Sequence, residues 1–142
     1  MSEENVELVR RWHAWLPDLR DLDPADDDAV ADRAFRDYLD ESFELRLPDY
    51  PDGEPIFRGR EGLSQWIERL RGVWAEWRFE PERFIEASDR VVVLVKIVAR
   101  GNSGVPVEMP TAHVVTLHGG RIASARAYRH GTEALEAVGL EP

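Results

Sequence analysis

The sequence contains no cysteine in its 142 residues. This absence excludes disulfide bonds, thiolate metal sites and a cysteine nucleophile together. The sequence also lacks a phosphate-binding glycine loop and the Gly-x-Ser-x-Gly turn that presents a nucleophilic serine.

Basic charge and long apolar runs are also scarce. The chain has 28 Asp and Glu residues but 18 Lys and Arg residues, which gives a net charge of -10 and no basic stripe. Nucleic acids and anionic membranes are therefore not expected as partners, because both require clustered positive charge. No apolar run approaches the ~20 residues of a membrane-spanning helix, and the acidic start does not resemble a secretory signal. We expect a cytoplasmic protein.

No pattern in the sequence predicts a metal or a cofactor. Asp40, Glu41 and Glu44 are close in sequence, but no His-x-His or Glu-x-x-His spacing accompanies them. The aspartates at 26–28 lack the glycine and the terminal glutamate of a calcium-binding loop. We interpret these carboxylates as solvated surface groups and expect neither a metal nor a cofactor.

Helical periodicity occurs in four segments. The first runs from an N-cap at Ser2 to Pro17, and the second occupies about 28–39. The third begins after Gly59 and has the widest apolar face of the chain. A short fourth helix is expected at 132–138. The apolar face of the third helix is expected to contain Leu63, Trp66, Ile67, Leu70, Val73, Trp74 and Trp77.

Other segments alternate between apolar and polar residues, as half-buried strands do. The Pro-, Gly- and Asp-rich segment 49–55 is expected to be a loop at the rim of a pocket. Because the helices precede a run of antiparallel strands, the order indicates an α+β fold and one domain over 1–142. The expected strands cover 42–47, 79–87, 90–100, 105–117 and 122–128.

Several segments, in their order and spacing, are shared with a known family. They are Asn5-Val-Glu-Leu-Val-Arg-Arg-Trp12, Phe57-Arg-Gly-Arg-Glu-Gly-Leu63, Glu108-Met-Pro-Thr-Ala-His-Val114, Leu117-His-Gly-Gly-Arg-Ile122 and 131–140. The chain resembles the SnoaL-like proteins of the nuclear-transport-factor-two-like superfamily, which includes ketosteroid isomerases. The resemblance implies a cone-shaped, curved antiparallel sheet wrapped on three N-terminal helices around an apolar pocket. It also implies a homodimer.

Enzymes of this superfamily use general acids and bases in an apolar pocket. By resemblance, isomerases and epoxide hydrolases have an Asp at the position of Ala112, and hydrolases and polyketide cyclases have one at Ala127. The isomerase base falls on Leu45 or Arg46, and the isomerase tyrosine on Trp12. None of these residues can serve as the expected acid or base, which argues against those three chemistries.

The two-residue turn at Gly119-Gly120 predicts how the last two strands pair. It places Ala112 opposite Ala127, so that both lie on one face and His113 lies on the other. A β-bulge would reverse this facing. His113 is interpreted either as a structural or interface histidine or as a pocket acid/base that titrates near neutrality.

Three further polar residues are candidates for catalysis. Arg129 shares a face with Ala127 and would bind a carboxylate or an enolate if that face is concave; surface exposure is the alternative. Tyr128 and His130 lie at the end of the sheet, where an edge or dimer contact is the alternative to catalysis. The candidate catalytic set is His113, Arg46, Arg129 and Tyr128.

Tryptophan is unusually frequent, with five residues in the chain. The indoles either pack in the core or line a pocket for a flat, apolar ligand. The expected ligand-binding residues are Trp12, Trp15, Trp66, Ala112, Val114 and Ala127.

Three functions remain open from the sequence. The first is a binding protein for a small apolar molecule in a Trp-rich pocket. The second is an isomerase, hydrolase or polyketide-cyclase-like enzyme that uses general acid/base chemistry on an apolar cyclic substrate. The third is an interaction module that binds a second copy or another protein through the outer face of the sheet.

Overall fold

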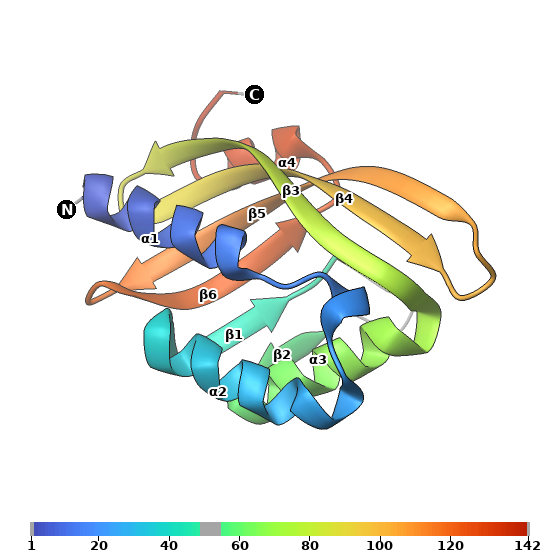
Figure 1. Cartoon of the computed structure of the whole chain (residues 1–142). Coiled ribbons are helices and arrows are strands. Elements are labelled where there is room, and N and C mark those ends of the chain that lie inside the picture. The colour runs from blue at the N-terminus through green and yellow to red at the C-terminus, as the bar shows by residue number, and fades with distance from the viewer. Residues whose placement is uncertain (1, 49–54, 142) are drawn as a thin grey trace.

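The computed structural model describes residues 2–48 and 55–141, which form four α-helices and a curved six-stranded sheet (Figure 1). The α+β fold class is thereby confirmed. The helices are α1 (Ser2–Trp15), α2 (Asp27–Asp37), α3 (Gly59–Val73) and α4 (Gly131–Ala137). The strands are β1 (Leu39–Arg46), β2 (Ile56–Arg58), β3 (Trp74–Ala87), β4 (Arg90–Gly101), β5 (Pro106–His118) and β6 (Arg121–Tyr128). The expected loop at 49–55 lies, except for Pro55, outside the described residues.

The strands follow the order β2-β1-β6-β5-β4-β3 across the sheet. The pairs β3–β4, β4–β5, β5–β6 and β1–β2 are antiparallel, whereas β1 runs parallel to β6. The expectation of an antiparallel sheet is therefore wrong for this one pair. Alternation along a strand indicates which residues share a face. It does not indicate whether two strands that are far apart in the sequence, such as β1 and β6, pair in parallel or antiparallel.

The helices lie on both faces of the sheet. The helix α1 crosses the inner face, and α2 and α3 pack side by side beside β1 and β2 (Figure 1). The helix α4 lies against β4, β5 and β6 on the outer face. The larger core lies between the inner face and the first three helices, and its fully buried members include Val9, Phe43, Val91, Val93 and Val115. No helix within the described residues is long and apolar enough to cross a bilayer.

The start of α3 depends on two glycines. Gly59 has φ of 66°, a left-handed conformation that a side chain disfavours. At Gly62, an added Cβ would lie 2.7 Å from the carbonyl carbon of Phe57, so the helix can approach β2 closely only without a side chain there. Together they position the buried Leu63 and Ile67 of α3 toward the sheet.

The expected end of the third helix is wrong. The helix α3 ends at Val73, and Trp74 and Trp77 belong to β3. A bulge at Ala75 inserts one residue opposite β4, so two tryptophans three residues apart lie on the same face of a strand. A spacing of three on one face is also the spacing of a helix, which explains the error.

Two more bulges control which residues face inward. The register of β3 shifts between Pro81 and Arg83, so that Phe79 and Phe84 both contact the inner core. The register of β5–β6 shifts at Thr116, where Ser124 and not Ala123 is the partner. These shifts bend the strands and help to give the sheet its curvature.

Candidate functional site

A cavity of about 670 Å³ lies between the inner face of the sheet and the helices. Its size falls within the ~300–1,000 Å³ typical of small-molecule sites. The wall is mostly aromatic and aliphatic, and none of the described wall residues is Asp or Glu. The polar residues on the wall are Thr111, His113, Arg129 and His130.

Aromatic rings from α3 and β3 form one side of the cavity. Trp66 and Phe79 are stacked, with ring planes at 10° and centroids 6.3 Å apart. Trp77 contacts Phe79 edge to face at 6.0 Å, and Trp74 lies 5.4 Å from Trp77. Flat, polarisable surfaces of this kind favour a flat apolar ligand.

Two histidines meet beside this aromatic wall. The Nε2 atom of His13 lies 3.2 Å from Nδ1 of His113, and Nδ1 of His13 lies 3.0 Å from the carbonyl oxygen of Val9. His13 is 2% exposed, whereas His113 borders the cavity. Phe79 contacts the His113 ring edge to face, with centroids 5.1 Å apart. The helix α1 and the strand β5 are thus joined by a side-chain hydrogen bond at the cavity wall.

Both histidines are neutral at physiological pH. Burial lowers the pKa of His13 from 6.5 to about 4, although its hydrogen bond to the Val9 carbonyl acts in the opposite direction. Burial, with a smaller effect of the neighbouring His13, lowers the pKa of His113 from 6.5 to about 3. A neutral imidazole has one N–H donor and one acceptor nitrogen, so this pair can form a directed chain of hydrogen bonds.

Residues 9–125 match one family model, the SnoaL-like domain. The chain belongs to the SnoaL-like domain family. The predicted membership of this superfamily is confirmed. No curated protein sequence matches the chain.

Solved structures share the fold of this SnoaL-like domain. An NTF2-like protein of unknown function from Burkholderia pseudomallei is 20% identical with a TM-score of 0.69, over 96% of this chain and 98% of that chain. TerC, co-crystallised with polyporic acid, is 19% identical with a TM-score of 0.69, over 95% and 98%. A hypothetical protein with a ketosteroid isomerase-like fold from Catenulispora acidiphila, in complex with trimethylamine, is 20% identical with a TM-score of 0.63, over 94% and 93%.

The expected pairing of Ala112 with Ala127 is wrong. The bulge at Ala123 shifts the register by one residue, so that Ala112 pairs with Tyr128 and His113 pairs with Ala127. Ala127 and His113 consequently both line the cavity. Ala112 and Val114 face the other way and pack in a second cluster with Ala134 of α4, so neither of them lines the cavity.

The other candidates from the sequence are divided between the two faces. Trp12, Trp15 and Trp66 lie on the cavity wall, as does Arg129. Tyr128 packs against the outer cluster, and the guanidinium of Arg126 lies 5.1 Å from its ring centroid. Arg46 is not among the cavity residues, and its guanidinium is 3.1 Å from Glu44. Arg46 and Tyr128 are therefore not placed to act on a molecule in the cavity.

Sequence reasoning missed His13. Its position four residues after Val9 puts it on the buried face of α1, where an uncharged polar side chain needs a partner. That spacing is a usable signal, because Val9, Trp12 and His13 fall on one face of a helix. The partner on β5 could not be found the same way, because the facing of His113 depends on a bulge.

Two indole groups on the wall lack partners. The Nε1 atoms of Trp12 and Trp77 are buried, and neither has a hydrogen-bond acceptor among the described residues. An unpaired buried donor costs about 1–3 kcal/mol, which the packing of the two indole rings must offset.

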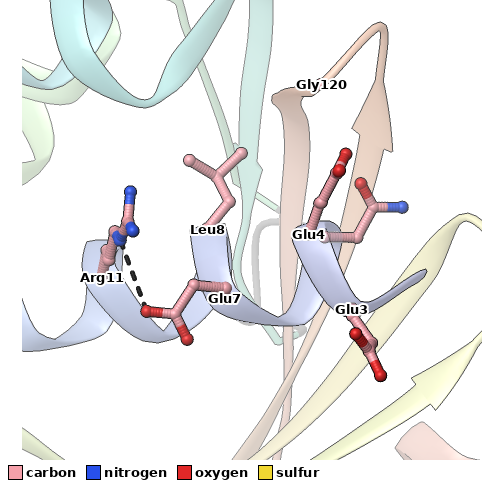
Figure 2. A pocket seen from close by; sticks show the side chains of 7 residues that line it. Glu3, Glu4, Glu7, Leu8, Arg11 and Gly120 are labelled. Atoms are coloured by element: carbon pink, nitrogen blue, oxygen red, sulfur yellow. Dashed lines mark ion pairs between the residues drawn. The ribbon is translucent and has the colours of Figure 1, made fainter. Parts of the chain in front are cut away.

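A second, shallower groove lies between α1 and the β5–β6 hairpin (Figure 2). Figure 2 shows Glu3, Glu4 and Glu7 on α1 beside Leu8, with Gly120 across the groove. Arg11 lies 3.4 Å from Glu7 and offsets part of this negative charge. The groove is open and charged, and it contains none of the aromatic wall that distinguishes the cavity.

Proposed function

We propose that this SnoaL-like domain binds a flat, largely apolar small molecule in the cavity. The observation that carries the proposal is the stacked aromatic wall of Trp66 and Phe79 around a cavity of about 670 Å³. Burying an apolar ligand there stabilises the complex by roughly 25 cal/mol per Å² removed from water. Few of the described wall residues are polar, as in sites where hydrogen bonds orient a ligand that apolar contacts hold.

Two structural neighbours with small molecules support the proposal. TerC was co-crystallised with polyporic acid, and the protein from Catenulispora acidiphila is in complex with trimethylamine. The outer face of β3 and β4 is less suited to binding than the cavity is. It carries ion pairs such as Lys96–Glu80 at 3.4 Å and Arg100–Glu76 at 3.8 Å, and so resembles a solvated surface more than an apolar docking face.

Binding of naphthalene derivatives tests the proposal, because these molecules are flat and accept excitation energy from tryptophan, which quenches its fluorescence. We expect 2-naphthol to quench the fluorescence of the wall tryptophans in a saturable manner. Ala127→Phe places a ring in the cavity and should weaken binding at least tenfold. Ala29→Phe makes the same change at an exposed alanine of α2 that does not line the cavity, and it should leave binding unchanged. Equal binding by both variants, or no saturable quenching, contradicts the proposal.

General acid/base catalysis is a second candidate, favoured by one observation. His113 lies on the cavity wall and is hydrogen-bonded to a second neutral histidine. Such a pair supplies an acceptor nitrogen for a substrate proton, and the described wall residues include no carboxylate that could take that role. The pKa of about 3 makes His113 a weak base until a negative charge develops beside it.

Proton exchange on a bicyclic ketone distinguishes catalysis from binding alone. The α-protons of 2-tetralone exchange with D₂O when a base removes them, and NMR follows the loss of their signal. Acid/base catalysis predicts faster exchange with the protein and a return to the background rate in His113→Ala. Binding without acceleration supports the first function and rejects the second for this substrate class.

A further inference from the structure

The hydrogen bonds of the two histidines have only one consistent direction. The carbonyl oxygen of Val9 can only accept, so Nδ1 of His13, at 3.0 Å, must carry a proton. A neutral ring has a single N–H, so Nε2 of His13 is an acceptor. The atom 3.2 Å away, Nδ1 of His113, must therefore carry the proton of that hydrogen bond. The chain of donors runs from His113 to His13 to Val9.

This direction determines what His113 offers to the cavity. With the proton on Nδ1, the Nε2 atom of His113 has a lone pair and no hydrogen. The two nitrogens lie on different sides of the ring, so Nε2 is directed away from His13. No described residue makes a hydrogen bond to this atom, and His113 borders the cavity. A hydroxyl or N–H group would satisfy it, whereas the lone pairs of a ketone would be repelled.

We propose that His13 is a positioning residue which holds His113 in the tautomer that accepts a hydrogen bond, so that the cavity selects flat apolar molecules with a hydroxyl or N–H donor. This inference rests on the proposed binding function and names its ligand class. Phenols and enols combine a flat, largely apolar body with such a hydroxyl donor.

The tautomer is tested without any ligand. Nitrogen-15 NMR of the histidine rings distinguishes a protonated nitrogen from an unprotonated one. We expect His13 and His113 to be protonated at Nδ1 and unprotonated at Nε2 at neutral pH. A protonated Nε2 on His113 overturns the inference. This result is independent of whether the cavity binds naphthalene derivatives.

The ligand class is tested with three matched molecules. In the wild-type protein, 2-naphthol should bind about fivefold to tenfold more tightly than 2-methoxynaphthalene and 2-acetylnaphthalene, which have no donor. Equal affinities for the three overturn the inference but leave the proposed function intact. Failure of all three to bind contradicts the proposed function itself, and the ligand preference with it.

Variants of His13 separate positioning from simple packing. His13→Met removes the acceptor, so the buried Nδ1 proton of His113 has no partner and the ring should change tautomer. The preference should then shift from 2-naphthol toward 2-acetylnaphthalene, and NMR should show the proton on Nε2. His13→Gln retains an acceptor oxygen and should retain the wild-type preference.

A purely structural role of His13 predicts a different outcome. It would lower the affinity for all three molecules equally in both variants and leave the order of affinities unchanged, which would overturn the inference. If His13→Met does not fold by circular dichroism, His113→Leu makes the comparison from the other partner. The preference for 2-naphthol must disappear in His113→Leu while 2-methoxynaphthalene still binds.

Discussion

The two faces of the same strands differ in how they are stabilised and in what they can do. On the outer face of β3 and β4, Glu80 lies 2.8 Å from Arg78 and 3.4 Å from Lys96. On the inner face of β3, Trp77 and Phe79 face the cavity. Exposed ion pairs contribute little because water screens them, whereas apolar burial and ring contacts contribute several kcal/mol.

This difference explains where selectivity can arise. A polar group on the outer face competes with water and can be exchanged at little cost. A polar group on the inner face has few partners, so each hydrogen bond is directional, as in the chain from His113 through His13 to Val9. Four predictions test this contrast, in order of decreasing effect.

Removing the buried ring of Phe43 should have the largest effect on stability. Phe43 is 1% exposed and contacts Trp12 and Phe35 edge to face, at 6.0 and 5.9 Å. Phe43→Ala should lower the free energy of unfolding by about 3–5 kcal/mol, measured by urea denaturation. A loss below about 1 kcal/mol would show that the inner face is not tightly packed at this position.

The histidine pair should make the protein sensitive to mild acid. Both folded pKa values, about 4 and about 3, lie below the ordinary 6.5, so the unfolded chain binds more protons as the pH falls below 6.5. The stability contributed by the neutral histidine pair is fully present above about pH 6.5 and is lost progressively as the pH falls toward 3–4. Between about pH 7 and 5.5, where carboxylates remain ionised, stability should fall by roughly 2–3 kcal/mol.

The control for this pH dependence is an exposed histidine. His118→Gln should leave the slope of stability against pH unchanged, whereas replacing His13 and His113 by Gln together should flatten it. An equal slope in the double variant and in the wild-type protein would show that the buried pair is not responsible.

Two alanines on neighbouring strands should respond differently to the same change. Ala112 is fully buried under α4, so Ala112→Phe overpacks the outer cluster and should cost about 1–3 kcal/mol. Ala127→Phe directs its ring into the cavity and should change stability much less while reducing ligand binding. Thermal unfolding of both variants tests the bulge at Ala123, because the unshifted register would make the two responses similar.

The smallest effect is expected at the outer ion pairs. Glu80→Gln removes the charge between Arg78 and Lys96, which are 39% and 36% exposed at their side chains. The urea midpoint should shift least among these variants, and the shift should disappear in about 1 M salt. A salt-independent loss comparable with that of Phe43→Ala would contradict the contrast between the faces.

Much of the fold could be predicted from the sequence. The alternation along β4 and β5 and the apolar stripe of α1 follow from residue spacing alone, and the segments shared with SnoaL-like proteins indicated the superfamily. The boundary between α3 and β3 could not be predicted, because a bulge gives Trp74 and Trp77 a helical spacing within a strand. The candidate site was predicted less well for the same reason, since one bulge reversed the facing of Ala112 relative to Ala127.

The sequence by itself determined most of the element types, though not the short strand β2 or the start of β3, and it determined the absence of cysteine chemistry and the family. These depend on composition and on contacts between residues close in the chain. Only the tertiary structure decided that His113 faces the cavity and that His13 is its partner, 100 residues away. The reason is that a single unpaired residue such as Ala123 changes the facing of a strand, and the sheet tolerates it because the bend fits the curvature around the helices.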